Sequence, residues 1–314
     1  LFRSAADGDI VINEIQTANV DRFVDPSWNY GGWIELYNPG TTQINLRGYW
    51  LSDDAERLQK VRVTQPVLLR AGGFANLWFD HHDKYCPSQI DMKLNTEGGT
   101  IYLSDRQGRL VTSADYPPAV SRASWARMTD GADEWGWTDS PTPAGSNGRQ
   151  TPCETRLPAP EPDCASGIFT GSLRVHVTFP QGATLCYTTD GSTPTPSHGG
   201  TSTTGTFTVG QTTILRLACY REGFLGSEVV TRSYLKRDKE FSLPIISIAS
   251  DPAHLYSDEM GIFVKGVNGR PGLGQSDPCN WNMDWDRPVN FDYIDAGGKS
   301  LLCQEAEIKR SGGW

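Results

Sequence analysis

Short segments in which apolar and polar side chains alternate run through residues 1–148. Three examples are "DIVINEIQ" at 9–16, "GGWIELYNPG" at 31–40 and "GGFANLWFD" at 72–80. A period of two places successive side chains on opposite faces, so each segment is typical of a half-buried β-strand. The segments recur roughly every ten residues with Gly, Asn and Asp between them, which predicts an antiparallel sandwich. Asp105–Gly108, between two such segments, predicts a hairpin turn.

Proline and polar residues interrupt this alternation between Ser140 and Cys164, which predicts a linker. The alternation returns in "LRVHVTF" at 173–179, "TLCYTTD" at 184–190 and "TILRLACY" at 213–220. A shorter, charged boundary follows at 235–244. The chain therefore divides into three parts, and the second part is again a predicted set of paired strands.

The amino-acid composition supports this division and limits the classes of partner that the chain is expected to bind. The chain of 314 residues has 37% hydrophobic residues, 33 Gly and 20 Pro, which favours a packed protein of many short strands joined by turns. Its formal net charge of −9 makes nucleic acid a poor partner. No apolar run approaches the ~20 residues that span a bilayer. The first residues lack a signal peptide's apolar stretch, so we expect that an exported form has already lost it.

The seven cysteines do not form a recognisable metal motif. They stand at positions 86, 153, 164, 186, 219, 279 and 303, and no two of them form a Cys-x-x-Cys pair. With only five scattered histidines, a structural zinc site is not expected. An odd number leaves at least one thiol free or paired between chains. An exported protein can form disulfides, but the spacing of these cysteines does not establish any pair.

The first part resembles the lamin-tail domain, an immunoglobulin-like β-sandwich. The resemblance rests on "VINEI", "WIELYNPG", "INLRGYWLSDD", "AGGFANLWFD", "LNTEGGTIYLSDRQG" and the closing "TDSPTPAGSN". The family usually closes with Pro-Gly-x-Asn, whereas here Ala144 precedes Gly145. The resemblance implies a module that binds partners and is not catalytic. Bacterial members are appended to exported enzymes and surface proteins.

The second part resembles the small β-sandwich at the C-terminus of chitobiases and β-hexosaminidases. Its signature is "TTDGSTPTP" at 188–196, in which Asp190-Gly191 makes a tight turn, and the later "TILRLACYREGFLGSEVVTRSY" agrees with it. In such a fold the strands that carry Cys186 and Cys219 are neighbours, with both side chains toward the same face or core. We therefore expect a disulfide between them, with two buried free thiols as the alternative.

The third part resembles the N-terminal stretch of CotH-type proteins, an atypical kinase family. The resemblance rests on "LPIISI", "GIFVKG", "NWNMDWDRPVNFDY" and "AEIKRSGGW". The resemblance implies that the lysine that binds nucleotide and the acidic residues that bind metal lie beyond Trp314. We therefore expect no cofactor in this chain, and ATP and Mg only for a longer natural protein.

These observations together predict an all-β chain. It has two immunoglobulin-like β-sandwiches in tandem and a β-rich, truncated CotH-like segment. The predicted boundaries are 1–148 for the lamin-tail-like sandwich, 149–160 for the Pro-rich linker and 161–238 for the chitobiase-like sandwich. The CotH-like segment then occupies 239–314.

The stretch 280–291, "NWNMDWDRPVNF", contains most of the candidate ligand-binding residues: Trp281, Asp284, Trp285, Asp286 and Arg287. Residues two apart on a strand face the same way, so the two carboxylates could meet a metal or a sugar. However, this part of the chain is acidic and lacks a Gly-rich phosphate loop. The alternative is packing, with the tryptophans capping a sheet and the arginine pairing locally.

Two further clusters are candidates. Trp135 and Trp137 lie in "SWARMTDGADEWGW" and are candidate surface anchors for a ligand, because exposed aromatic rings stack on sugars and anchor interfaces. A place in the sandwich core, or in an acidic solvated loop, is the alternative. "DHHD" at 80–83 suggests a metal only if it forms a loop, and a solvated turn is the preferred interpretation.

Two functions remain open from the sequence. One is a non-catalytic binding or scaffold protein whose sandwiches present loops to a cell-surface glycan or an envelope protein. The other is the N-terminal fragment of a secreted CotH-like kinase, inactive as this chain. Both imply export to the periplasm, the outer membrane or the cell exterior, with a lipid anchor upstream as one arrangement. No catalytic or metal-binding residue is predicted, because no serine-hydrolase, zinc-protease or phosphate-loop motif occurs.

Overall fold

The computed structural model describes residues 10–80, 86–238, 240–272 and 274–311. The chain divides into two compact units, Leu1–Glu154 and Thr155–Trp314. The division falls inside the predicted linker, and the second unit contains both the second predicted sandwich and the third segment. In the described ranges no helix has the length and apolar character needed to cross a membrane.

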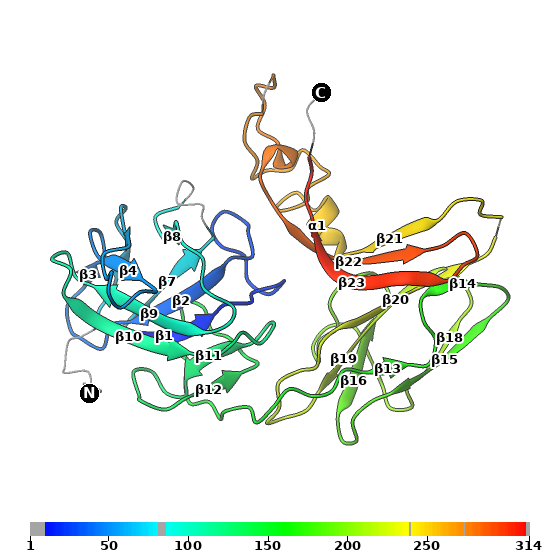
Figure 1. The fold of residues 1–314 in the computed structure, drawn as a ribbon, viewed down its shortest axis with the longest axis horizontal. Helices are drawn as coiled ribbons and strands as arrows, with labels where there is room; N and C mark the ends of the chain where they lie inside the picture. The colour runs from blue at the N-terminus through cyan, green and yellow to red at the C-terminus, as the bar shows by residue number, and fades with distance from the viewer. Residues whose placement is uncertain (1–9, 81–85, 239, 273, 312–314) are drawn as a thin grey trace. The chain divides into compact units, whose positions relative to one another are not determined.

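Unit 1 consists of short strands, drawn from blue to green in Figure 1. Their bounds are β1 (Val11–Gln16), β2 (Gly32–Tyr37), β3 (Ile44–Asn45), β4 (Trp50–Ser52), β5 (Val61–Arg62), β6 (Leu68–Leu69), β7 (Phe74–Phe79), β8 (Gln89–Ile90), β9 (Gly99–Ser104), β10 (Leu110–Tyr116), β11 (Ser124–Arg127) and β12 (Trp135–Thr138). Among the described residues these strands form one sheet in the order β12-β11-β1-β2-β7-β8, another in the order β10-β9-β4-β5, and the pair β3-β6.

The register explains which side chains form the core of unit 1. Ile15, Ile34 and Leu77 lie opposite one another on β1, β2 and β7, and all three are buried in the core between the sheets. The alternate positions point to the other face of the same sheet. The predicted hairpin between β9 and β10 is confirmed, with the Gly108 N–H donating to the Asp105 carbonyl at 3.0 Å.

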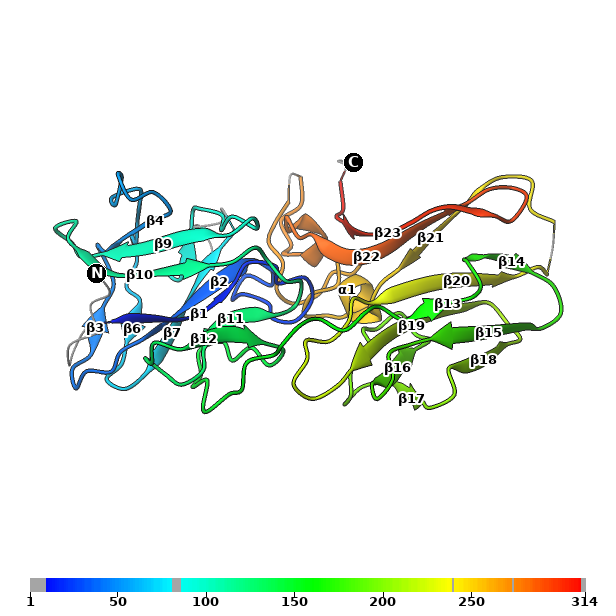
Figure 2. The same cartoon turned by 60° about the horizontal axis from the view of Figure 1, so that its bottom comes forward.

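Unit 2 contains the remaining strands and short helices, drawn from green to red in Figure 2. Their bounds are β13 (Glu161–Pro162), β14 (Gly167–Phe169), β15 (Leu173–Thr178), β16 (Thr184–Thr188), β17 (Gly200–Ser202), β18 (Thr206–Val209), β19 (Thr213–Tyr220), β20 (Val230–Lys236), β21 (Ile245–Ala249), α1 (Pro252–Tyr256), η1 (Asn280–Asn282), β22 (Arg287–Ile294) and β23 (Ser300–Ile308).

The strands of unit 2 form three layers, as Figure 2 shows. In the described residues the orders are β13-β15-β18, β14-β20-β19-β16-β17 and β21-β22-β23. The first two sheets enclose an apolar core that includes Val175, Leu217 and Tyr234. The third sheet packs on the outer face of the second through Ser247, whose Oγ lies 3.0 Å from that of Ser233 on β20. The predicted fold class, all-β with tandem immunoglobulin-like sandwiches, is confirmed.

The prediction that Cys186 and Cys219 share a face is wrong. Their strands β16 and β19 are neighbours, as expected, but Cys186 lies opposite Ala218 and Leu185 lies opposite Cys219. Because directly opposed residues point to the same face, the two cysteines point to opposite faces of the sheet. Both are buried free thiols, which is the alternative that the sequence left open.

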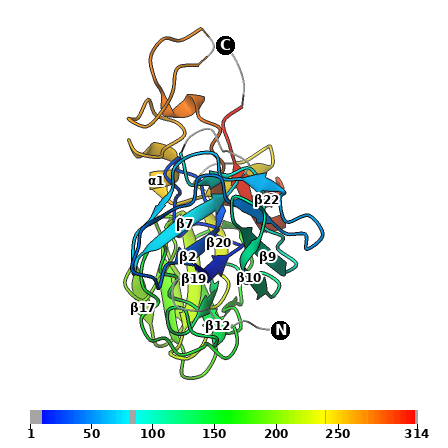
Figure 3. The same cartoon turned by 90° about the vertical axis from the view of Figure 1, so that its left-hand side faces the viewer.

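The irregular segment between β21 and β22 lies at one end of the third sheet, where Figures 1 and 3 show it in yellow and orange. It begins with α1, whose N-cap Asp251 accepts a hydrogen bond from the Ala253 N–H at 2.8 Å. Near its end lies η1, and the candidate residues Asp284 to Arg287 follow after Met283. This segment therefore places most of the predicted ligand-binding residues at one end of the third sheet, where its central strand begins.

Candidate functional site

The predicted residues Trp285 and Arg287 are part of the packing of unit 2. Both are 0% exposed. The Arg287 guanidinium lies over the Trp285 ring at 4.6 Å, and its Nε donates to the Met260 carbonyl at 3.0 Å. This cation–π pair connects the start of β22 to the irregular segment. The structure thus places these two side chains where no ligand can reach them without rearrangement.

The other candidate residues of this stretch lie nearer the surface. Asp284 and Asp286 are exposed, and the Lys309 Nζ lies 3.0 Å from an Asp284 oxygen. Hydrogen bonding to Asp284, with a further contribution from Asp286, raises the pKa of Lys309. A lysine therefore sits beside both carboxylates. Trp281 is half-buried, with Arg310 over its ring at 5.7 Å.

Trp135 and Trp137 lie on β12, the edge strand of the larger sheet of unit 1. The Trp135 ring stacks on Trp125 at 6.2 Å and 11°, and Arg127 lies over it at 4.7 Å. Trp137 meets Trp125 edge-on at 5.5 Å. Trp135 also packs on the sandwich core, so much of its ring is already in contact with protein. Both tryptophans are half-buried, and their predicted ligand binding stays a prediction.

The "DHHD" stretch lies largely outside the described residues, since only Asp80 of the four is described. The Asp80 Oδ2 accepts a hydrogen bond from Gln89 at 2.9 Å. Burial raises the pKa of the neighbouring Asp25 to about 6, and the proximity of Asp80 adds to the shift. Among the described residues no cluster of His, Cys, Asp and Glu forms a metal site.

Two buried carboxylates, Glu14 and Glu35, face each other across β1 and β2 on the outer face of their sheet. Thr142 donates to Glu14 through its backbone N–H and its hydroxyl, and the Gly145 N–H donates to Glu35 at 3.0 Å. Asn13 donates to Glu35 at 2.9 Å. These contacts fasten residues 142–147, the closing segment, onto the sheet.

Burial changes the chemistry of this pair. It raises the pKa of Glu35 to about 8, and the nearby charge of Glu14 adds to the shift. Burial also raises the pKa of Glu14, although hydrogen bonds from Ser124 and Thr142 oppose the change. Glu35 is therefore largely protonated at neutral pH. The two glutamates and the closing segment come from three of the lamin-tail-like motifs, and they join distant parts of the sequence.

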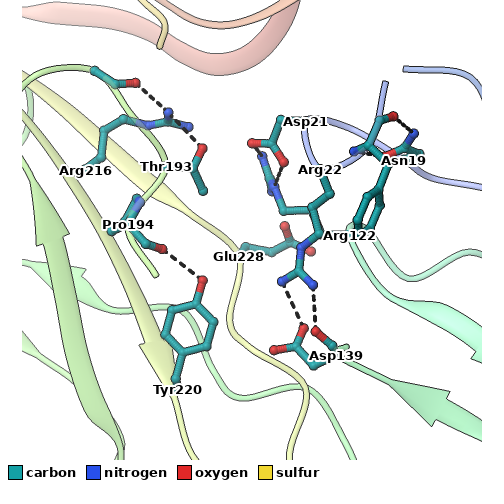
Figure 4. Close-up of polar contacts among 12 residues, drawn as sticks. Asn19, Asp21, Arg22, Arg122, Asp139, Thr193, Pro194, Arg216, Tyr220 and Glu228 are labelled. Atoms are coloured by element: carbon teal, nitrogen blue, oxygen red, sulfur yellow. Dashed lines mark hydrogen bonds and ion pairs between the residues drawn. The ribbon is translucent and has the colours of Figure 1, made fainter. Parts of the chain in front are cut away.

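Ion pairs hold the loop between β1 and β2. Arg122 forms a bidentate ion pair with Asp21, in which its Nε and Nη2 donate to the two carboxylate oxygens at 2.8 and 3.1 Å. Both side chains are buried. Arg22 donates to the Asp139 carbonyl at 2.6 Å and approaches its carboxylate at 3.3 Å, as Figure 4 shows. Paired carboxylates of this kind are fixed by arginine geometry and serve the fold of unit 1.

The signature "TTDGSTPTP" forms a loop that is fastened within unit 2. Arg216 on β19 donates to the Gly191 carbonyl at 2.8 Å, and Tyr220 donates to the Pro194 carbonyl at 2.9 Å (Figure 4). Gly191 has φ +91°, and a Cβ there would lie 2.2 Å from the Ser250 carbonyl oxygen. The loop therefore contacts the residue that follows β21. Its signature residues join the second sandwich to the third segment.

The described part of the chain includes a groove of about 410 Å³ in unit 1 and one of about 610 Å³ in unit 2. The groove of unit 2 lies between β16, β18 and β19. It is lined by Tyr187, Thr189, Phe207, Thr208, Val209, Gly210, Gln211, Thr212, Thr213 and Leu215. None of these described residues is charged. The rings of Tyr187 and Phe207 meet at 5.0 Å.

Comparison with known proteins agrees with two of the three parts. Residues 3–118 match the Lamin Tail Domain, and residues 164–231 match the Chitobiase/beta-hexosaminidase C-terminal domain. Neither match reaches the third part. These matches support the two immunoglobulin-like modules.

The remaining comparisons add little. No curated protein matches the chain. One similar solved structure is described as "Biofilm associated protein - BSP domain", with 11% identity, a TM-score of 0.18, and coverage of 98% of this chain and 67% of that one. A TM-score of this size does not indicate a shared fold.

The sequence interpretation missed the groove of unit 2. Tyr187 and Phe207 lie on β16 and β18, which belong to different sheets of the sandwich. The visible signal was the threonine-rich stretch at 204–213, which is rich in hydroxyl groups but has the composition of an ordinary turn. Only the packing of the two sheets brings this stretch, which contains Phe207, next to the ring of Tyr187.

Proposed function

We propose that this chain is a non-catalytic, multi-module binding or scaffold protein of the bacterial cell surface or periplasm. The observation that carries the proposal is the uncharged groove of unit 2. The neutral polar residues Thr208, Gln211 and Thr212 line this groove together with the aromatic residues Tyr187 and Phe207. Aromatic rings with neutral hydrogen-bonding groups are suited to a neutral saccharide.

The modular organisation supports this proposal. The chain matches two domain families that we expect to act as accessory modules, and both matched regions are sandwiches. Such sandwiches present loops and grooves from a rigid scaffold, which suits binding better than it defines a reaction. The proposed partner is a cell-surface glycan, and export of the protein follows from that partner.

A glycan screen tests the proposal. Purified protein is titrated with neutral cell-envelope oligosaccharides, and binding is measured by calorimetry. Loss of two side-chain hydrogen bonds in the variant Thr208→Ala/Gln211→Ala should weaken binding about tenfold. Thr178→Ala, an exposed threonine on β15 outside the groove, is the matched control and should bind as before. Absence of binding at millimolar ligand, or an equal loss in the control, would count against the proposal.

A second candidate is favoured by the third sheet. Its covered face carries the buried Asp292 and Ile294, whereas Ile246 and Ile248 on the opposite face are 58% and 45% exposed. Leu302, opposite Tyr293 on that open face, is 44% exposed. An apolar sheet face open to water is typical of an interface.

We infer as this second candidate that the third segment begins a CotH-like kinase domain within a longer natural protein, whose following residues cover the open face. Nucleotide and Mg would then bind outside these residues. The test is incubation of the complete natural protein with ATP and magnesium, with the 314-residue chain as the matched control. Labelling of neither the protein nor any substrate would argue against a kinase and leave the glycan-binding proposal in place.

A further inference from the structure

Three arginines converge on the hollow of about 410 Å³ in unit 1. It is lined by Asn45, Arg47, Gly48, Arg62, Val63, Thr64 and Arg106. None of these described lining residues carries a carboxylate, although the whole chain has a net charge of −9. Three like charges around one hollow repel one another, so a group of opposite charge would be stabilised there.

The structure holds these arginines in place. Arg106 donates from Nε to the Arg47 carbonyl and from Nη2 to the Asn45 carbonyl, each at 2.9 Å. It also lies over the Tyr49 ring at 5.8 Å, and Arg62 lies over the Trp50 ring at 5.5 Å. The two carbonyls use only part of the donor set of the Arg106 guanidinium. A ligand would therefore meet a guanidinium whose orientation is already fixed.

Gly48 shapes the floor between these arginines. It has φ +90°, and a Cβ at this position would lie 3.2 Å from Arg106 Cγ and 3.5 Å from Arg62 Nη2. The backbone therefore approaches both arginines at a point where a side chain would intrude. This arrangement keeps open a space that most residues would fill.

The acidic residues nearest in sequence to Arg106 and Arg47 are engaged by other cations. Asp105 pairs with Arg109 at 2.7 Å, and Asp53 pairs with Lys60 at 2.5 Å. Neither aspartate lines the hollow. Neither of these two ion pairs therefore involves an arginine that lines the hollow. Planar guanidinium groups match carboxylate and phosphate oxygens well.

We propose that this hollow, the arginine pocket, binds a sugar that carries an anionic group, a carboxylate or a phosphate. Its volume exceeds that of an inorganic ion and suits a sugar-sized ligand. The pocket lies in unit 1 and is independent of the groove of unit 2. Either site can therefore fail without affecting the inference about the other.

Calorimetry on the whole chain tests the pocket with galacturonate hexasaccharide, a sugar phosphate and a neutral hexasaccharide. Arg106→Gln and Arg62→Gln should each weaken binding of the anionic probe about tenfold, because each removes a charged hydrogen-bond donor. The control is Arg109→Gln, an exposed arginine near the pocket that does not line it, which should change affinity less than twofold. Melting curves verify that each variant is folded.

The outcomes separate the sources of the anion. Preference for galacturonate assigns a carboxylate sugar, and preference for the sugar phosphate assigns a phosphate. Binding that weakens at high salt supports either assignment. The proposal is overturned if no anionic probe binds at millimolar concentration, if the neutral probe binds equally well, or if Arg109→Gln weakens binding as much as the pocket variants.

Discussion

Glu35 shows how burial alters the chemistry of a single side chain. Its sequence position, in an alternating segment, is typical of a polar residue that faces water. The closing segment instead covers it, and burial raises its pKa to about 8. Because residues distant in sequence cover it, the Glu35 carboxyl group is largely uncharged at neutral pH.

The stability of unit 1 should therefore decrease as pH rises. Unfolded Glu35 titrates near 4.5 and folded Glu35 near 8, so the folded state retains a proton that the unfolded state releases. The stability that protonated Glu35 contributes is fully present below about pH 4.5 and is lost as the pH rises through about 8. We expect Glu35→Gln, which cannot ionise, to show a smaller fall in melting temperature across this window.

The control for Glu35 is Glu97→Gln, which changes an exposed carboxylate. It should retain the wild-type dependence of melting temperature on pH. The measurement is thermal unfolding followed by circular dichroism. Parallel pH profiles for wild type and Glu35→Gln would contradict the assignment of the raised pKa to Glu35.

The thiols of Cys186 and Cys219 should remain unpaired. They point to opposite faces of one sheet, and burial raises the pKa of Cys219 to about 11. A protonated, buried thiol reacts slowly with alkylating agents. We expect neither cysteine to be modified in native protein near neutral pH and both to be modified in denaturant. Peptide mapping without reductant would disprove this if it recovered the two cysteines joined by a disulfide.

At the scale of elements, the turn at Asp190-Gly191 connects the second sandwich to the third sheet. Gly191 contributes a positive φ, and its backbone lies against the Ser250 carbonyl. Arg216 holds the same residue from β19. A loop recognised as a family signature thus has a structural role in unit 2.

Gly191→Ala should loosen this connection. The positive φ costs about 1–2 kcal/mol for a residue with a Cβ, and the overlap with Ser250 adds to it. Gly223→Ala is the matched control, because Gly223 has φ +78° but nothing lies within 4 Å of a Cβ there. Hydrogen exchange should increase in β21 and β22 for Gly191→Ala only. Equal exchange in both variants would show that the contact with Ser250 is unimportant.

At the scale of the whole molecule, the chain consists of two compact units, Leu1–Glu154 and Thr155–Trp314. Each has its own apolar core, one around Ile34 and Leu77 and the other around Val175 and Leu217. A domain with its own core is able to fold independently.

Fragments 1–154 and 155–314 should therefore each fold when expressed alone. We expect limited proteolysis of the whole chain to cut first between 149 and 160, and each fragment to melt cooperatively. The control is a pair of expressed fragments divided inside unit 1, between β4 and β5, and both fragments should be unfolded. A fragment 155–314 without a cooperative transition would mean that unit 2 depends on unit 1.

The sequence by itself determined the strands, the hairpin at Asp105–Gly108 and the presence of two sandwiches. These features depend on local rules: a period of two, turn residues and proline-rich breaks. Matches at 3–118 and 164–231 agree with the modules predicted from the motifs. The individual boundaries of the third segment stay predictions.

Only the tertiary structure decided which residues meet. The register of β16 and β19 placed Cys186 and Cys219 on opposite faces, and a shift of one residue would have reversed one of them. Packing buried Trp285, which the pattern left open as a ligand-binding residue. The arginine pocket also depends on strand pairing, because Arg62 and Arg106 are far apart in the chain. Local patterns set each strand, whereas long-range pairing sets the chemistry between strands.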